Sequence, residues 1–220
     1  MAKMVWDQAG ERTYETGVEQ AAIYVMSGTT YGSGAPWNGL TGVTESPSGA
    51  EPTALYANNK KYGELMSAEE FGGTIEAYTY PDEFKACNGE ATLAKGAVIA
   101  QQTRSLFGMV YKTLIGNDTE GTKFGYKLNI VYGARVKPSE KANATINDSP
   151  EAQTMSWEFS TTPVALANGL STSKVTIDST DADPEKLAAL EAKLYGTESE
   201  EPTLILPDEI ATILGEAVAG

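Results

Sequence analysis

Hydrophobic and polar residues alternate along several stretches of this chain, and this period of two constrains the fold more than any other feature. Between Phe124 and Tyr132 every second position is apolar, and Lys127 and Asn129 lie between them. Successive side chains of a β-strand point to opposite faces. The pattern therefore predicts a strand over residues 123–136 with one buried face and one face in water.

The same alternation recurs in residues 153–163, where Met155, Trp157 and Phe159 share one face and small hydroxyl residues flank Glu158 on the other. Clusters of Gly, Pro, Asn and Asp separate such runs, as expected for turns between strands. The clearest hairpin joins the strand ending at Ile115 to the one beginning near Phe124 through the turn Gly116–Gly121. The sequence thus predicts a mainly β fold, a sandwich or a barrel-like sheet. We expect strands near Arg12–Met26, Trp37–Glu45, Lys61–Met66, Glu70–Tyr80, Val98–Gln101, Arg104–Ile115, Lys123–Val136, Gln153–Pro163 and Lys174–Asp178.

Helical signals are few and most lie near the C-terminus. Pro81–Cys87 predicts a short helix flanking the sheet, ended by Asn88-Gly89. Asp183 as cap, Pro184 in the first turn and leucines at helical spacing predict a helix over 183–195, and a second one begins at Pro207. Residues 183–220 carry nine acidic and two basic residues, half of the chain's excess charge. We therefore divide the chain into a β domain, residues 1–182, and an acidic helical extension, residues 183–220.

Charge and composition exclude several functions. The net charge of −14 disfavours binding of nucleic acid or of an anionic membrane by the monomer. The chain has no histidine, and its one cysteine, Cys87, is expected to be a small buried thiol. Gly116–Lys123 resembles a phosphate loop, but its residue order is wrong for one. We expect a protein that is not an enzyme, with no cofactor and no metal. Because the N-terminus has no signal-peptide pattern, we expect it to be kept in a cytosol until assembly.

Two polar segments without periodicity, Ser27–Pro36 and Lys137–Pro150, are candidates for contacts with a neighbouring subunit. The alternative is that they are solvated, irregular loops. The candidate contact residues are Lys137, Glu140, Lys141, Asn143, Asn147, Asp148 and Tyr31.

A series of segments resembles the major tail proteins, or tail tube proteins, of long-tailed bacteriophages, of the non-contractile type. The segments are Glu11–Val18 (ERTYETGV), Trp37–Leu40 (WNGL), Thr44–Thr53 (TESPSGAEPT), Ser67–Gly72 (SAEEFG), Thr74–Phe84 (TIEAYTYPDEF), Gln101–Arg104 (QQTR), Thr113–Gly121 (TLIGNDTEG), Asn147–Ala152 (NDSPEA) and Ser156–Val164 (SWEFSTTPV). They occur in the expected order and cover roughly residues 10–180. The C-terminal extension shows no such resemblance.

The resemblance implies a β-sandwich with a flanking helix, six copies in a ring, and rings stacked into a tube. Each copy would contribute strands to a continuous barrel around a channel for DNA, which passes as cargo during ejection into the host. The implied partners are further copies of the chain, the tape measure protein, the tail terminator and the distal tail or baseplate proteins. The implied location is the virion tail, after assembly in the host bacterial cytoplasm.

The resemblance also implies an acidic channel, and physics agrees, because a wall of Lys and Arg would hold DNA through its phosphates. We expect Glu158, with Ser156 and Ser160, to line the channel. Glu19 and Glu76 are weaker candidates, because their strands alternate less regularly.

Two other readings explain part of the pattern. A soluble β-sandwich binding module, such as a virion decoration domain or a carbohydrate-binding domain, accounts for the strands and polar loops. A carboxylate-based hydrolase requires two Asp or Glu residues facing each other across a cleft.

Overall fold

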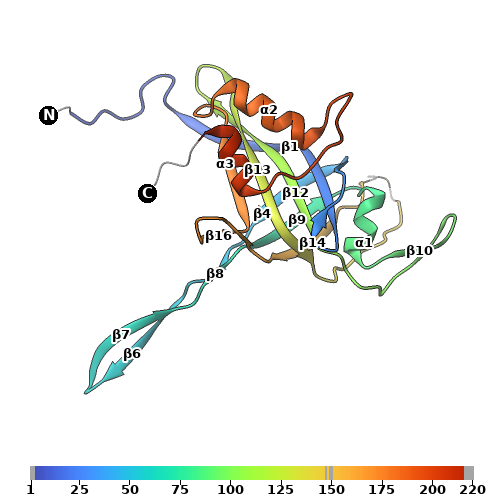
Figure 1. The fold of residues 1–220 in the computed structure, drawn as a ribbon, viewed down its shortest axis with the longest axis horizontal. Helices are drawn as coiled ribbons and strands as arrows, with labels where there is room; N and C mark the ends of the chain where they lie inside the picture. The colour runs from blue at the N-terminus through green and yellow to red at the C-terminus, as the bar shows by residue number, and fades with distance from the viewer. Residues whose placement is uncertain (1–2, 147, 149–150, 216–220) are drawn as a thin grey trace.

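A large, curled antiparallel sheet forms the centre of the computed structural model, which describes residues 3–146, 148 and 151–215 (Figure 1). Along the sheet the strands are β2 (Thr30–Tyr31), β1 (Thr13–Ser27), β12 (Phe107–Asn117), β13 (Gly121–Val136), β14 (Met155–Thr161), β9 (Gly72–Ala77) and β4 (Leu40–Glu45). In addition, β17 (Lys174–Asp178) pairs with β13, and β3 (Ala35–Pro36) pairs with β1. The predicted mainly β fold is confirmed. Over the described ranges the sheet curls without closing into a barrel, and β4 ends the path.

The central hairpin forms where the sequence predicts it. Strands β12 and β13 pair from Phe107↔Ala134 to Asn117↔Gly121. The Asn117 side-chain oxygen accepts hydrogen bonds from the backbone N–H groups of Thr119 and Glu120, at 3.2 and 2.6 Å. Because this Asn side chain takes the place of a backbone acceptor, the turn is fixed locally by its own sequence.

The concave side of the sheet encloses an aromatic cluster. Phe84 lies at its centre, with its ring centroid 4.6 Å from that of Trp37 and 5.2 Å from that of Trp157. It is delivered by η1 (Asp82–Phe84) and α1 (Lys85–Asn88), the short helix that the sequence predicts, which ends at Gly89 with a φ of 76°. Tilted and edge-on ring contacts of this kind add to the free energy gained by burying apolar area.

Two C-terminal helices cover the opposite face of the sheet. They are α2 (Pro184–Tyr195) and α3 (Pro207–Leu214), and Asp183 caps α2 by accepting hydrogen bonds from the N–H groups of Glu185 and Lys186. The three leucines of α2 are buried in a second cluster with the outer side chains of β12, β13 and β17. The residues of the acidic extension that the structure describes therefore pack on the sheet, while the division at residue 182 stays a prediction.

The expectation of a solvated face on the strand over residues 123–136 is wrong for its second half. From Leu128 to Ala134 every residue of β13 is buried. Asn129, which the alternation places on the solvated face, is among these buried residues. Its side-chain oxygen accepts a 2.9 Å hydrogen bond from the Thr176 hydroxyl. The second half of β13 lies between the aromatic cluster and the second cluster under the C-terminal helices. Because β17 supplies a hydrogen-bond partner for Asn129, this polar side chain can be buried. Alternation alone does not reveal such burial.

A buried ion pair joins the sheet to α2. The Lys112 ammonium lies 2.9 Å from the Glu191 carboxylate, with 9% of the lysine side chain exposed. The same ammonium lies 4.2 Å from the centroid of the Tyr126 ring. Because a buried charge without its partner is costly, this pair favours one position of the helix on the sheet.

Three small hairpins among the described residues lie outside the large sheet. They are β6 (Pro52–Ala57) with β7 (Lys60–Met66), continued at their base by β5 (Ser48–Gly49) with β8 (Glu69–Glu70); β10 (Ala91–Ala94) with β11 (Ala97–Ile99); and β15 (Val164–Ala165) with β16 (Ser171–Thr172). Sequence patterns predicted β7 and β11 but missed their partners β6 and β10. None of the helices in the described part of the chain is long and apolar enough to cross a membrane.

Replacing Leu190 with alanine tests the packing of the C-terminal segment. Leu190 is fully buried, so the cavity should lower the free energy of unfolding by about 2–5 kcal/mol. Ala189→Ser, at an exposed position of the same helix, should change it by less than about 0.5 kcal/mol. Chemical denaturation followed by circular dichroism measures both. Equal values for the two variants would contradict the observed packing.

Cys87 provides a second test, of the aromatic cluster. The thiol is fully buried, as expected from the sequence, and burial raises its pKa to about 12. Because the thiolate is the reactive form, the native protein should resist alkylation at neutral pH, whereas protein unfolded in denaturant should react fully. Rapid labelling of the native protein, read by mass spectrometry, would contradict this placement.

Candidate assembly surfaces

Four of the five residues expected to line a channel lie on one exposed face of the sheet. Strands β14 and β9 pair so that Ser156 is opposite Glu76 and Glu158 is opposite Thr74. Ser160 follows on the same side of β14, and all four of the candidate side chains are exposed. Directly opposed residues of an antiparallel pair share a face. The structure therefore brings these four candidates together in a smooth polar surface, which we call the polar face.

The polar face also carries two basic side chains that the sequence pattern does not predict there. Arg135 is exposed and lies opposite Ser160 on the neighbouring strand β13. Lys137 forms an ion pair with Glu158 and its backbone N–H donates to the Glu158 carbonyl. In the isolated chain the polar face therefore carries two carboxylates, of Glu76 and Glu158, and two basic side chains, so these four charges sum to zero.

Glu19 stands apart from the other four. It lies on β1 opposite Lys112, at a position flanked by two irregularities in the strand register. Lys112 faces α2, so Glu19 belongs to the helix-covered side of β1 and β12. Bulges turn a side chain away from simple alternation, which explains why its strand gave the weaker signal.

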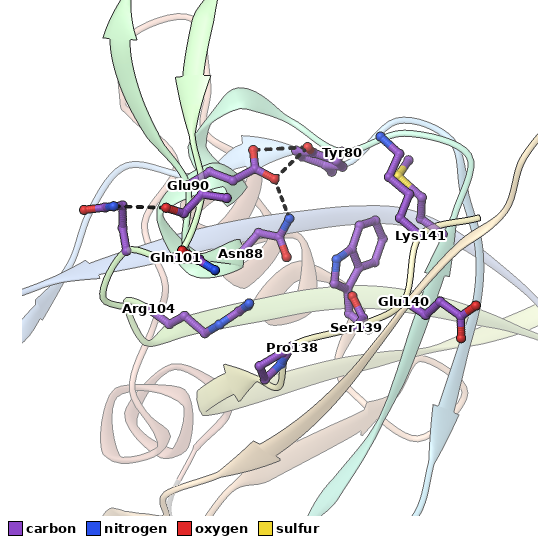
Figure 2. A pocket seen from close by; sticks show the side chains of 13 residues that line it. Tyr80, Asn88, Glu90, Gln101, Arg104, Pro138, Ser139, Glu140 and Lys141 are labelled. Atoms are coloured by element: carbon purple, nitrogen blue, oxygen red, sulfur yellow. Dashed lines mark hydrogen bonds between the residues drawn. The ribbon is translucent and has the colours of Figure 1, made fainter. Parts of the chain in front are cut away.

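The predicted contact segment Lys137–Pro150 borders a pocket in its first part. The pocket has a volume of about 540 Å³ and is lined by residues 138–141 together with Tyr80, Asn88, Glu90 and Arg104 (Figure 2). Of the other candidates, Asn143 and Asp148 are exposed, and Asn147 lies outside the described residues. Exposure leaves these side chains accessible to a neighbour, and their role in contacts stays a prediction.

Glu90 organises the polar wall of this pocket. Its carboxylate accepts hydrogen bonds from the Asn88 amide at 2.7 Å and from the Tyr80 hydroxyl at 3.2 Å. Burial and then the charge of Glu90 raise the pKa of Tyr80. Figure 2 shows the other carboxylate of the pocket, on Glu140, pointing away from Glu90, so the pair does not form the facing arrangement that a glycosidase needs.

Tyr31 is engaged within its own chain. The Ser27–Pro36 segment forms strands β2 and β3 on the edge of β1, so it is not the irregular loop that the sequence suggested. The Tyr31 hydroxyl accepts a 2.9 Å hydrogen bond from the N–H of Gly133, and its ring packs against the second cluster. Burial raises its pKa. The aromatic ring is thus a structural contact of the protomer.

Several large exposed apolar side chains belong to the hairpin β6–β7, which we call the arm (residues 48–70). Figure 1 shows the arm projecting away from the curled sheet. Tyr56 and Tyr62 are 74% and 80% exposed, and Leu65 and Met66 are 60% and 68% exposed. Exposed apolar side chains gathered on one projecting element indicate an interaction site.

The sequence contains a hairpin signal for the arm that does not depend on alternation. Asn58 and Asn59 have φ values of 49° and 59°, and Ala57 pairs with Lys60 across them. This is a two-residue hairpin turn with positive φ at both positions, for which Asn is one of the few suitable residues. The flanking strands lack alternation because neither face is buried in the protomer.

Comparisons with known proteins add little. No family model matches the chain, and no curated protein matches it. Among solved structures, one similar chain comes from a 6-fold symmetrised cryo-EM structure of the anti-feeding prophage (AFP) baseplate, with 79% of this chain and 97% of that chain covered, a TM-score of 0.37 and 7% sequence identity. Similarity at this level carries no argument about function. Within the described residues, no group of three or more Cys, Asp or Glu side chains is arranged to hold a metal ion.

Proposed function

We propose that this chain is the building block of a phage tail tube, a structural protein whose copies form hexameric rings that stack into a conduit for DNA. The observation that carries the proposal is the arm, whose apolar side chains have no partner within the described protomer. Contact with another copy of the chain would remove this surface from water while leaving the fold intact. The resemblance of residues 10–180 to major tail proteins supports the same conclusion.

The sheet supports the proposal through its free edge. Strand β4 ends the path of the large sheet, and an unpaired edge favours pairing with another chain. Continuation of the sheet from copy to copy would close a ring and present the polar face, which adjoins β4, to the bore. In this arrangement DNA is cargo, the role is not catalytic, and the tape measure, terminator and distal tail proteins are the neighbours at the tube's interior and ends.

The alternative, a soluble binding module, rests on the pocket beside Glu90. Its volume of about 540 Å³ lies within the usual range for ligand sites. However, Trp157, the aromatic residue best suited to stacking on a sugar, is 2% exposed. The pocket therefore gives only weak support to a binding module, and the exposed arm supports assembly more strongly.

Shortening the arm tests the proposed function. Replacing residues 52–66 with a short Gly-Ser linker should leave the protomer folded, with the melting temperature changed by less than about 2 °C, because the arm contributes to neither hydrophobic cluster. Electron microscopy and sedimentation should show rings or tubes for the unmodified chain and monomers for the variant. Tubes of normal appearance from the shortened chain would contradict a role of the arm in assembly. Persistent monomers of the unmodified chain that bind glycan would favour the alternative.

Reversing charge on the polar face tests the bore. The double variant Glu76→Lys/Glu158→Lys should still assemble, since both side chains are exposed, but its tubes should retain DNA at about 50 mM salt and release it at about 200 mM. Glu185→Lys at an exposed position of α2, combined with Glu120→Lys at an exposed position of the β12–β13 turn, makes the same charge change elsewhere. Equal DNA retention by both sets of tubes, measured by fluorescence of bound dye after nuclease treatment, would place the polar face outside the bore.

A further inference from the structure

An apolar groove of about 450 Å³ lies where the edge of β1 meets the end of α2. Its walls are formed by Ala21, Ala22, Ala35, Pro36, Leu194 and Tyr195. The Tyr195 hydroxyl donates a 3.1 Å hydrogen bond to the Gln20 carbonyl, and the Gly34 N–H donates to the Pro202 carbonyl at 3.0 Å. These bonds tie the strand, the edge and the helix together, so the groove is a fixed feature of the protomer.

A short acidic loop follows directly on the groove. Glu198, Glu200 and Glu201 are exposed, and none of them takes part in the ion pairs found among the described residues. The Thr197 hydroxyl oxygen accepts hydrogen bonds from the N–H groups of Ser199 and Glu200, at 3.3 and 3.1 Å, which folds the loop into a turn. The loop connects Tyr195 to Pro202, two residues that line the groove, and Glu200 and Glu201 also border a second pocket beside Lys193.

The tip of the arm has the complementary chemistry. Lys60 and Lys61 are the only adjacent pair of basic residues in the sequence, in a chain with a net charge of −14. They are flanked by Tyr56 and Tyr62, which are largely exposed. Lys61 forms an ion pair with Glu64 of the arm, with both side chains about half exposed, and an exposed pair of this kind exchanges its partner at little cost.

We propose that the arm tip of a second copy of this chain binds in this groove, with its tyrosine rings against the apolar walls and Lys60 and Lys61 beside the carboxylates of the 198–201 loop. The proposal rests on the proposed self-assembly and names its binding surface. Arm and groove lie at opposite ends of the protomer, since Figure 1 shows the arm extending to the lower left and the loop after α2 at the upper right. A contact between two different surfaces of identical chains repeats from copy to copy and produces rings or open stacks.

Zero-length crosslinking tests for this contact in the unmodified protein. A carbodiimide joins a lysine amine to a carboxylate only where the two groups come into direct contact, so assembled particles should yield linked peptides containing Lys60 or Lys61 and Glu198, Glu200 or Glu201. Particles grown from a mixture of isotope-labelled and unlabelled chains distinguish links between copies from links within one. Links between copies that join the 198–201 loop only to other segments, or the arm only to carboxylates elsewhere, would overturn the assignment. Links within one copy, such as those from Lys193 to the neighbouring Glu200 or Glu201, do not enter this comparison.

A charge exchange provides the matched functional test. Lys60→Glu/Lys61→Glu should raise the critical concentration for assembly at least tenfold. Adding Glu198→Lys/Glu200→Lys/Glu201→Lys in the same chain should return the critical concentration to that of the parent. Lys95→Glu/Lys123→Glu, which changes two exposed lysines elsewhere, should assemble normally, and all variants should keep the melting temperature of the parent. Assembly of the arm variant at the parental concentration, or no recovery in the combined variant, would refute the docking proposal while leaving the tube intact. Failure of the unmodified chain to assemble would instead refute the proposed function, and the docking proposal with it.

Discussion

The structure depends on the burial of both faces of the β12–β13 hairpin. One face encloses the aromatic cluster around Phe84, and the other carries the cluster under α2 and α3. Burying apolar area on two sides gives these strands most of the available hydrophobic stabilisation, and the Lys112–Glu191 ion pair fixes how the outer layer lies. The remaining strands extend this framework on either side.

The rigid framework explains why the candidate assembly surfaces lie at its margins. The polar face occupies the strands that the C-terminal helices leave uncovered, the groove lies where the edge of β1 meets α2, and the arm is a hairpin whose residues join neither cluster. Each surface is thus free to bind a neighbour without unfolding any part of the protomer. Because these surfaces are already folded in the protomer, the entropic cost of ordering chain segments on assembly is small.

Local chemistry made several elements predictable from the sequence. The β12–β13 turn follows from the Asn117 side chain, and the start of α2 follows from Asp183 and Pro184, because in both cases the decisive hydrogen bonds are made within a few residues. Alternation on β14 likewise placed Ser156, Glu158 and Ser160 on one exposed side. Distant partners were not predictable. The burial of Asn129, the pairing of Glu158 with Lys137 and the exposed apolar strands of the arm all depend on which segments meet in space.

The order of the elements along the chain has a consequence for biosynthesis. The outer side chains Val110, Leu128, Ile130 and Tyr132 of the central hairpin are covered by a segment that leaves the ribosome after all the strands. At about 5–20 residues per second, translating residues 183–214 takes roughly 2–6 s. During this time the outer apolar face of the nascent sheet is exposed to solvent. The order of the elements along the chain therefore leaves this face exposed to aggregation until the C-terminal helices are synthesised, unless a chaperone or the ribosome surface covers it.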